Sequence, residues 1–441
     1  MGLLCAVLYW ALLAWLPCVW AFMAATLFGI EVGVLSYWMN SYWGGSVPAI
    51  GGALALGALT RLRREPRVSN SLLMAIGLMI VLNSRPLEGV LLSVIAGAAL
   101  LCWSFVTKEL RRASLLCRVL PGVALAFSAG LTFMGYYNQH VTGAVSKFPY
   151  LLYRQRYAMP QGFVWQKPLK VSTPLPADIK ALYQFQLETH ERGRSPRGLA
   201  RLTAKKIRRM WVFYVGVPLT VALVCLPFIW QGANMMLALI VLLVIVGFDN
   251  LTFFDYFPHY SSPVTVLIVL VIAQCLRRMR MSGRAGLFLS RSLPIVCALG
   301  LVVPMFGRFL EPWMSTQVIR LWQHEFVSPA PRAKFLKWLD KQAGQQLVLV
   351  RYVSSELSDK TPVFKTEKLR RENGWVYNRA DLSASKIIWA RELDPESNRQ
   401  LLECFPGRKV WLAEPEQNPP RLRLYSDSAS LRAASDIGSA K

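Results

Sequence analysis

The sequence predicts a mainly α-helical, polytopic membrane protein: a bundle of about ten transmembrane helices followed by a small extracytoplasmic α/β domain. Three observations carry this prediction. Hydrophobic residues make up 54% of the 441 residues. Charged residues make up 17%, below the roughly 25% of soluble proteins. Finally, much of the net charge of +25 lies in short basic runs between apolar segments, which is typical of the positive-inside rule rather than of a nucleic-acid-binding protein.

Apolar segments recur along the first two thirds of the chain. A span needs roughly 20 apolar residues, or fewer where protein continues the helix. The expected spans lie near Leu3–Trp15, Val19–Tyr37, Val47–Leu59, Ser71–Leu82, Val90–Val106, Val119–Tyr136, Trp211–Trp230, Met235–Val246, Val264–Leu276 and Leu293–Phe306. They form a predicted bundle at residues 1–309, which includes a long polar loop at residues 138–209. Ser261 and Ser262, followed by Pro263, predict the N-cap and first turn of the ninth span.

Basic runs predict the orientation of the bundle. They fall at alternate turns, at Arg61–Arg67, Lys108–Arg118 and Arg277–Arg284, and should be cytoplasmic. The turns between them and the whole tail should then face outward. The basic run Lys205–Arg209 opposes this orientation, but long loops cross a membrane largely regardless of charge.

The tail alternates helical and strand-like patterns and predicts an α/β domain at residues 310–426. Helices are expected at residues 332–342 and 395–405, and strands at residues 346–352, 385–390 and 409–413. Residues 427–441 contain no aromatic side chain and are rich in Ser and Ala, so we expect a disordered tail there.

The stretch at residues 248–263 is the first candidate site. It places Asp249, Asp255 and His259 between two apolar segments. Such groups are costly near hydrocarbon, so a cluster of them at the end of a bundle predicts a substrate or ion site. Asp255 and His259 are candidate ligands of a divalent metal ion, or alternatively a base and its orienting partner.

The turn at residues 83–89 is the second candidate site. Pro86 fixes its backbone, and Glu88 should lie in the first turn of the next helix, where its charge suits the helix dipole. Arg85 and Glu88 have two interpretations. They form a local ion pair, or Arg85 binds a phosphate or sugar hydroxyl as a planar donor fork.

A third candidate, at residues 37–46, interleaves aromatic, amide and small residues. The segment is either an aromatic belt at the membrane surface or a platform for a sugar or lipid, with Asn40, Tyr42 and Trp43 as its binding residues. Glu31, inside the second span, should be protonated, paired with another helix, or part of a polar path.

Six motifs together resemble bacterial multi-pass GT-C class glycosyltransferases, a group related to lipid A aminoarabinose transferases and protein O-mannosyltransferases. They lie at residues 35–59, 83–89, 253–263, 347–352, 375–378 and 386–393. The resemblance implies an enzyme of the bacterial inner membrane with an extracytoplasmic C-terminal domain. Its donor would be a polyprenyl-phosphate-linked hexose or pentose, and its acceptor a periplasmic molecule or a lipid.

The resemblance also implies a carboxylate that acts as the catalytic base. In the family this aspartate lies in the first extracytoplasmic loop, whereas the first aspartate here is Asp178. We therefore expect either that a further helix and loop precede Met1 or that the protein is an inactive relative. Within the chain, Asp255 and Asp249 are the candidate acid or base. The predicted substrate-binding residues are Arg85, Glu88, His259, Tyr260, Asn40, Tyr42 and Trp43.

Two other classes of function stay open. A transporter or flippase for a lipid or small anion would use Glu31, Arg85 and Asp255 along a polar path, although transporters usually carry such groups at mid-bilayer, often with inverted repeats. A non-catalytic scaffold would use the tail to bind a partner. None of these classes involves nucleic acid.

Overall fold

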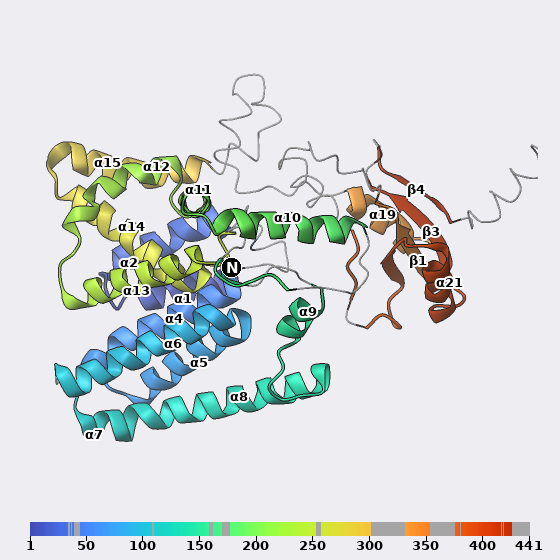
Figure 1. Cartoon of the computed structure of the whole chain (residues 1–441). Coiled ribbons are helices and arrows are strands. Elements are labelled where there is room, and N and C mark those ends of the chain that lie inside the picture. Colours follow the sequence, from blue (N-terminus) through green and yellow to red (C-terminus); the bar gives the residue numbers. More distant parts are fainter. Residues whose placement is uncertain are drawn as a thin grey trace, which may run out of the picture. The chain divides into compact units, whose positions relative to one another are not determined.

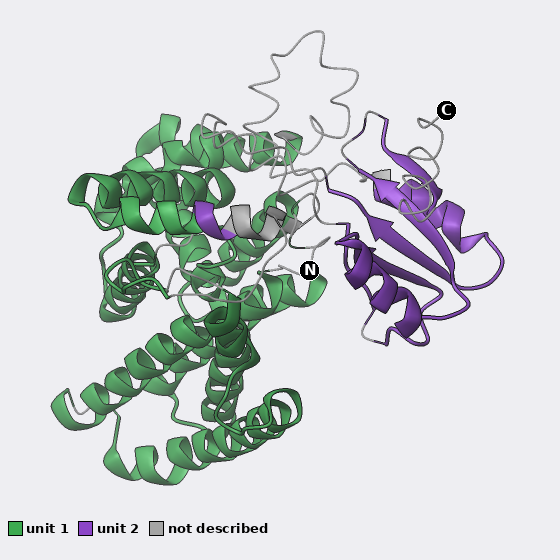
Figure 2. Ribbon diagram, turned by 45° about the vertical axis from the view of Figure 1, so that its right-hand side comes forward, with its two compact units in different colours: residues 1–171, 186–326 green, residues 172–185, 327–441 purple. Residues whose placement is uncertain are grey.

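The computed structural model describes residues 1–33, 36, 38, 45–107, 110–157, 162–169, 177–252, 257–300, 331–352, 375–379, 381–415, 417 and 419–425. The chain divides into two compact units, residues 1–171 with 186–326 and residues 172–185 with 327–441 (Figure 2). The first unit is helical, and the second contains the sheet.

The helices of the first unit are labelled in Figure 1. The first half of the unit contains α1 (Gly2–Leu12), α2 (Cys18–Phe28), η1 (Gly29–Gly33), α4 (Ser46–Arg64), α5 (Val68–Ser84), α6 (Pro86–Leu101), η2 (Cys102–Val106), α7 (Arg112–Ser114), η3 (Leu115–Val119) and α8 (Leu120–Thr142). The second half contains α9 (Pro149–Tyr157), α11 (Pro196–Tyr214), α12 (Gly216–Thr220), η4 (Val221–Phe228), α13 (Ala233–Asn250), η5 (Ser262–Val264), α14 (Thr265–Arg280) and α15 (Gly283–Gly300). Helix α10 (Ala177–Gly193) belongs in part to each unit.

Several of these helices are long and apolar enough to cross a membrane. Among the described residues there are 4 such segments, Pro86–Val106, Arg112–Thr142, Ala233–Asn250 and Ser262–Arg280. Shorter apolar helices lie at Gly2–Leu12, Cys18–Val32 and Val68–Ser84. These segments indicate a membrane protein, whereas the count of ten spans stays a prediction.

One expected span is not a straight helix. Residues 211–230 were expected to cross the membrane in one piece, but α11 and the segment Gly216–Phe228 meet at an angle of 105°. Gly216 has a φ of 63°, which an L side chain rarely adopts, and Pro218 follows it. Residues 196–209 of α11 lie within the stretch that was expected to be a loop, and its last residues belong to the expected span.

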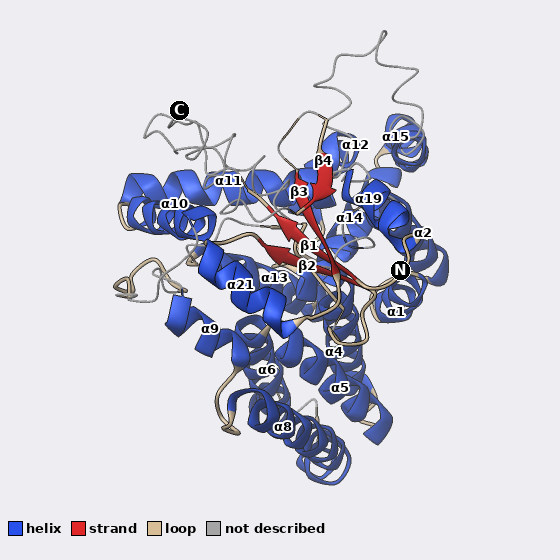
Figure 3. Ribbon diagram, turned by 90° about the vertical axis from the view of Figure 1, so that its right-hand side faces the viewer, coloured by secondary structure: helices blue, strands red, loops and turns tan. Residues whose placement is uncertain are grey.

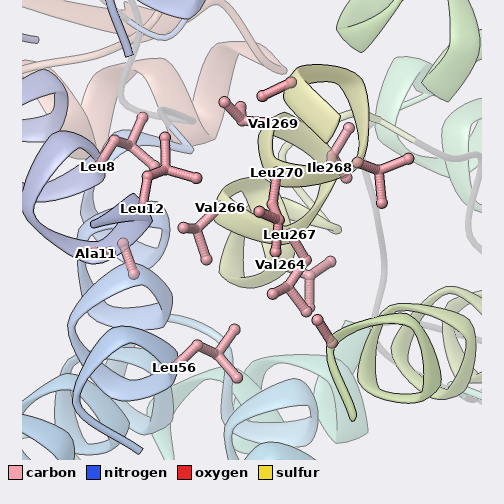
Figure 4. Packing of buried hydrophobic residues seen from close by; sticks show 14 of the residues in the cluster. Leu8, Ala11, Leu12, Leu56, Val264, Val266, Leu267, Ile268, Val269 and Leu270 are labelled. Carbon is pink, nitrogen blue, oxygen red and sulfur yellow. The ribbon is translucent and has the colours of Figure 1, made fainter. Parts of the chain in front are cut away.

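The segment Ser262–Arg280 is the centre of the first unit. In its most apolar window 83% of the residues are buried, against 22% for Arg112–Thr142. Figure 4 shows side chains of α1, α4 and α14 that meet in this core. The labelled residues are Leu8, Ala11, Leu12, Leu56, Val264, Val266, Leu267, Ile268, Val269 and Leu270.

Small residues bring α4 very close to its neighbours. A Cβ atom on Gly52 would lie 1.7 Å from the carbonyl oxygen of Pro263, and one on Gly77 of α5 would lie 2.5 Å from the backbone nitrogen of Ala55. Small residues at helix interfaces allow such backbone approach in membrane proteins. Helix α4 therefore contacts both α5 and the start of the central span.

The second unit is a four-stranded sheet, drawn in red in Figure 3. Its order is β2 (Ile387–Arg391), β1 (Gln346–Val350), β3 (Lys409–Glu414) and β4 (Arg421–Leu424). The first three strands are parallel, and β4 is antiparallel to β3. The helices α19 (Pro331–Asp340) and α21 (Pro395–Cys404) confirm the two predicted in the tail, and β1, β2 and β3 confirm the three predicted strands. The strand β4 was not predicted.

Three tryptophans, Trp375, Trp389 and Trp411, form the core of this sheet with aliphatic side chains. At the carboxyl ends of the strands, Arg351 forms ion pairs with Glu392 and Glu414. The pairs raise the pKa of Arg351, mainly through the hydrogen bond to Glu392. Two strand ends with like charges are thus joined by one guanidinium group.

Candidate functional site

The candidate site lies at one end of the helices of the first unit, around the corner between α5 and α6. Arg85 is the C-cap of α5 and the N-cap of α6, and Pro86 occupies the first turn of α6. Glu88 lies in that first turn, as the sequence predicted. The tight corner fixes the backbone of Arg85 on both sides.

Arg85 lies over the ring of Tyr260, with 4.6 Å between its guanidinium carbon and the ring centroid. Stacking of this kind is a cation–π contact. Glu88, Asp249 and His259 are electrostatic neighbours of the same guanidinium group. The structure therefore brings together five of the predicted site residues from two distant parts of the sequence.

Asp249 is buried at the end of α13, with 4% of its surface exposed. The hydroxyl of Ser261 donates a hydrogen bond to its carboxylate, at 2.9 Å. The predicted positions of Ser261 at the N-cap and of Pro263 in the first turn are confirmed, but without a capping hydrogen bond. Ser261 is the N-cap residue of η5, but its side chain makes no capping hydrogen bond and instead binds Asp249.

Lys206 of α11 is a site residue that the sequence argument missed. It is 3% exposed, and its ammonium group donates to the carbonyl oxygens of Asp249 and Thr252 at 3.0 and 2.6 Å. A cation there satisfies carbonyl groups that a helix end leaves unpaired. Lys206 lies on the same face of α11 as Leu202 and Phe213. A lysine on an otherwise apolar face of a helix is the sequence feature that could have identified it as a buried, functionally placed residue.

The turn that carries His259 and Tyr260 is held from two sides. Tyr214, at the end of α11, donates its hydroxyl to the carbonyl oxygen of Pro258 at 2.9 Å. Ser262 donates to the carbonyl oxygen of His259 at 2.7 Å. Both bonds orient the backbone of this turn, and the aromatic ring of Tyr260 with it.

Burial and the positive charge of Arg85 lower the pKa of His259 to about 3. The imidazole is therefore neutral at ordinary pH. It can orient a ligand through hydrogen bonds, but it does not add positive charge to the site. Arg85 supplies the charge that an anion would meet first.

The remaining predicted residues divide into two groups. Asp255, Asn40, Tyr42 and Trp43 lie outside the described residues. Glu31 lies in η1 and has the Cys297 thiol of α15 as its hydrogen-bonding neighbour, which agrees with one of the three expected alternatives, a partner on another helix.

Metal binding by Asp255 and His259 stays a prediction. In the part of the chain that the structure describes, no group of three or more His, Cys, Asp or Glu side chains is placed to hold a metal ion.

The site combines a stacked arginine, two carboxylates and a neutral histidine at the end of apolar helices. Such a set can bind an anionic group through the guanidinium fork. Comparisons with protein families, curated proteins and solved structures found no match. The resemblance to GT-C glycosyltransferases therefore stays a prediction from the motifs.

Proposed function

We propose that the protein is a glycosyltransferase of the bacterial inner membrane that binds a polyprenyl-phosphate-linked sugar at the Arg85 site and transfers the sugar to a periplasmic or lipid acceptor. The observation that carries the proposal is Arg85 itself, whose guanidinium group is oriented by the ring of Tyr260. A fixed planar fork is the preferred ligand for a phosphate group. Arg85 is half-buried, so part of it is open to a ligand.

The position of Arg85 supports a lipid-borne phosphate. Arg67 is the N-cap of α5 and Arg85 its C-cap, so the basic turn at residues 61–67 and the site lie at opposite ends of this helix. The helix has 17 residues, which corresponds to about 25 Å, close to the thickness of a bilayer core. With the basic turn in the cytoplasm, the site faces the periplasm, where the headgroup of a polyprenyl phosphate would reach it.

The two candidate carboxylates fit different roles. The carboxylate of Asp249 is buried and bound by Ser261, and its backbone carbonyl accepts from Lys206, so it suits a positioning residue that holds α13 and the turn together. We therefore assign the acid or base role to Asp255 and the orientation of the donor to His259 and Tyr260. Glu88 would hold Arg85 in place.

Binding of a long-chain polyprenyl phosphate to the purified protein tests the phosphate assignment. Arg85→Gln should weaken binding about tenfold or more, because losing a hydrogen bond to a charged group costs about 1.5–3 kcal/mol. Binding of the uncharged polyprenol should not change, which also reports that the variant is folded. Arg280→Gln, an exposed position at the far end of α14, is the matched control and should behave like the unmodified protein.

Transfer is measured separately, in membranes supplied with a polyprenyl-phosphate-linked hexose or pentose. Asp255→Asn should abolish transfer while leaving phosphate binding intact. Unchanged phosphate binding in Arg85→Gln would refute the site. Unchanged transfer in Asp255→Asn would refute the assignment of the base.

A further inference from the structure

The helix α11 carries a basic stripe, defined as Arg197, Arg201, Lys205 and Arg208. These positions are spaced by four, four and three residues, so they share one face of the helix. All four residues are exposed, and residues 196–214 contain no Asp or Glu. The opposite face is buried through Lys206, Phe213 and Tyr214. The contacts of that face hold α11 on the first unit and turn the basic stripe away from its core.

The bend after Tyr214 sets the orientation of α11 relative to the apolar segment that follows it. The apolar segment Gly216–Phe228 meets α11 at 105° and exposes large apolar side chains, among them Val224 and Phe228. Figure 1 shows α11 nearly along its axis, whereas α12 and α13 run across the view. The apolar segment packs against α14 and α15. With this segment embedded in the membrane beside them, a helix at 105° to it lies along the membrane surface.

The hydrogen bonds of Lys206 fix the depth of α11 relative to the end of the neighbouring span. Its acceptors, the carbonyl oxygens of Asp249 and Thr252, lie where the span Ala233–Asn250 ends. Next to the basic stripe, the exposed face also carries Ala200, Ala204 and Ile207. A helix with a basic face and an apolar flank at this level is typical of the membrane–water interface.

The positive-inside rule does not account for these charges. The basic turns that obey it lie at the other ends of α5 and α14, whereas α11 contacts the end that carries the Arg85 site. A second set of positive charges at that end needs a local reason. Anionic phospholipid headgroups attract basic residues within a Debye length of the surface.

We infer that the basic stripe of α11 binds the headgroups of anionic phospholipids and holds the helix flat on the membrane surface. The ligand is the bulk lipid surface, so the inference is independent of what the Arg85 site binds. It also gives α11 a function that its place in a predicted loop did not suggest.

The test uses the full chain in nanodiscs, with its native cysteines replaced and a fluorophore at Ala204→Cys. Nitroxide-labelled phosphatidylglycerol should quench this fluorophore more strongly than nitroxide-labelled phosphatidylcholine. Replacing all four residues of the basic stripe by Gln should lower the ratio of the two quenching efficiencies to about one, because each basic residue near the surface adds to the attraction. High salt should lower the ratio in the same direction.

The matched control replaces four exposed arginines elsewhere, Arg64, Arg111, Arg280 and Arg284, by Gln, and should leave the ratio at Ala204 unchanged. Equal quenching by both lipids in the starting protein would overturn headgroup binding. A lipid preference that survives in the stripe variant would overturn the residue assignment. If neither lipid quenched the fluorophore and an acidic peptide protected it instead, the basic stripe would be assigned to a protein partner.

Discussion

Lys206 shows how a single side chain can assemble a site without touching a ligand. Its ammonium group binds backbone carbonyl groups at the end of α13, and its contacts reach the residue whose carboxylate binds Ser261. The chain from Lys206 through Asp249 to Ser261 therefore links α11, α13 and the turn before α14. The ring of Tyr260, and with it Arg85, depends on that link.

The buried His259 should make the stability of the folded protein depend on pH. Its pKa is lowered from 6.5 to about 3 in the folded state, so below pH 6.5 the unfolded chain binds a proton that the folded protein does not. Stability should therefore fall as the pH falls. From pH 6.5 to pH 5 the loss should be roughly 2 kcal/mol, at about 1.4 kcal/mol per pH unit.

Unfolding of the detergent-solubilised protein at pH 7 and pH 5 measures this loss. His259→Gln should remove about 2 kcal/mol of the difference between the two values. His140→Gln, at an exposed position on α8, is the control and should leave the difference unchanged. An equal pH dependence in His259→Gln and the unmodified protein would contradict the prediction.

Among the helices, α4 approaches the backbone of η5 closely next to the site. The added Cβ of Gly52→Ala would overlap the carbonyl oxygen of Pro263, which is backbone and cannot rotate away. We expect a loss of about 1–3 kcal/mol, typical of overpacking. Thermal unfolding measures it.

Gly97→Ala is the matched control on α6. A Cβ at Gly97 would have no atom within 4 Å. Alanine is the better helix former by up to about 1 kcal/mol, so this variant should be as stable as the unmodified protein or slightly more stable. If Gly52→Ala had the same melting temperature as Gly97→Ala, the close approach of α4 to Pro263 would be refuted.

The elements differ in how far the sequence could predict them. Composition was sufficient for the apolar helices and for the parallel strands of the tail, because runs such as Leu347–Val350 are buried whole. The sequence did not predict the bend at Gly216, because an apolar run of this length is typical of one straight span. The bond from Lys206 to Asp249 joins residues far apart in sequence, and no local pattern encodes such a pairing.

For the whole molecule, the orientation in the membrane is the property that the proposals share. Glu65 and Ser84 are exposed residues near opposite ends of α5, and the native Cys404 is exposed in the second unit. A membrane-impermeant maleimide added to intact spheroplasts should label Ser84→Cys and Cys404, each as the sole cysteine of the chain. Glu65→Cys should react only after permeabilisation.

The reverse pattern would place the Arg85 site in the cytoplasm and remove the periplasmic part of the proposed function. Labelling of Ser84→Cys without Cys404 would instead contradict the predicted side of the tail alone. The reverse pattern would also let the positive-inside rule account for the basic stripe of α11, so headgroup binding would then rest on the quenching experiment alone.

Helix α4 also joins the two ends of the first unit mechanically. Near one end, Arg61 lies over the ring of Trp10 in α1, with 4.2 Å between the guanidinium carbon and the ring centroid. Towards the other, Gly52 lies against the backbone of Pro263, three residues after Tyr260. One helix therefore contacts α1 at the basic end and the backbone next to the Tyr260 side of the site, so a change in the packing of α4 at either contact bears on the other.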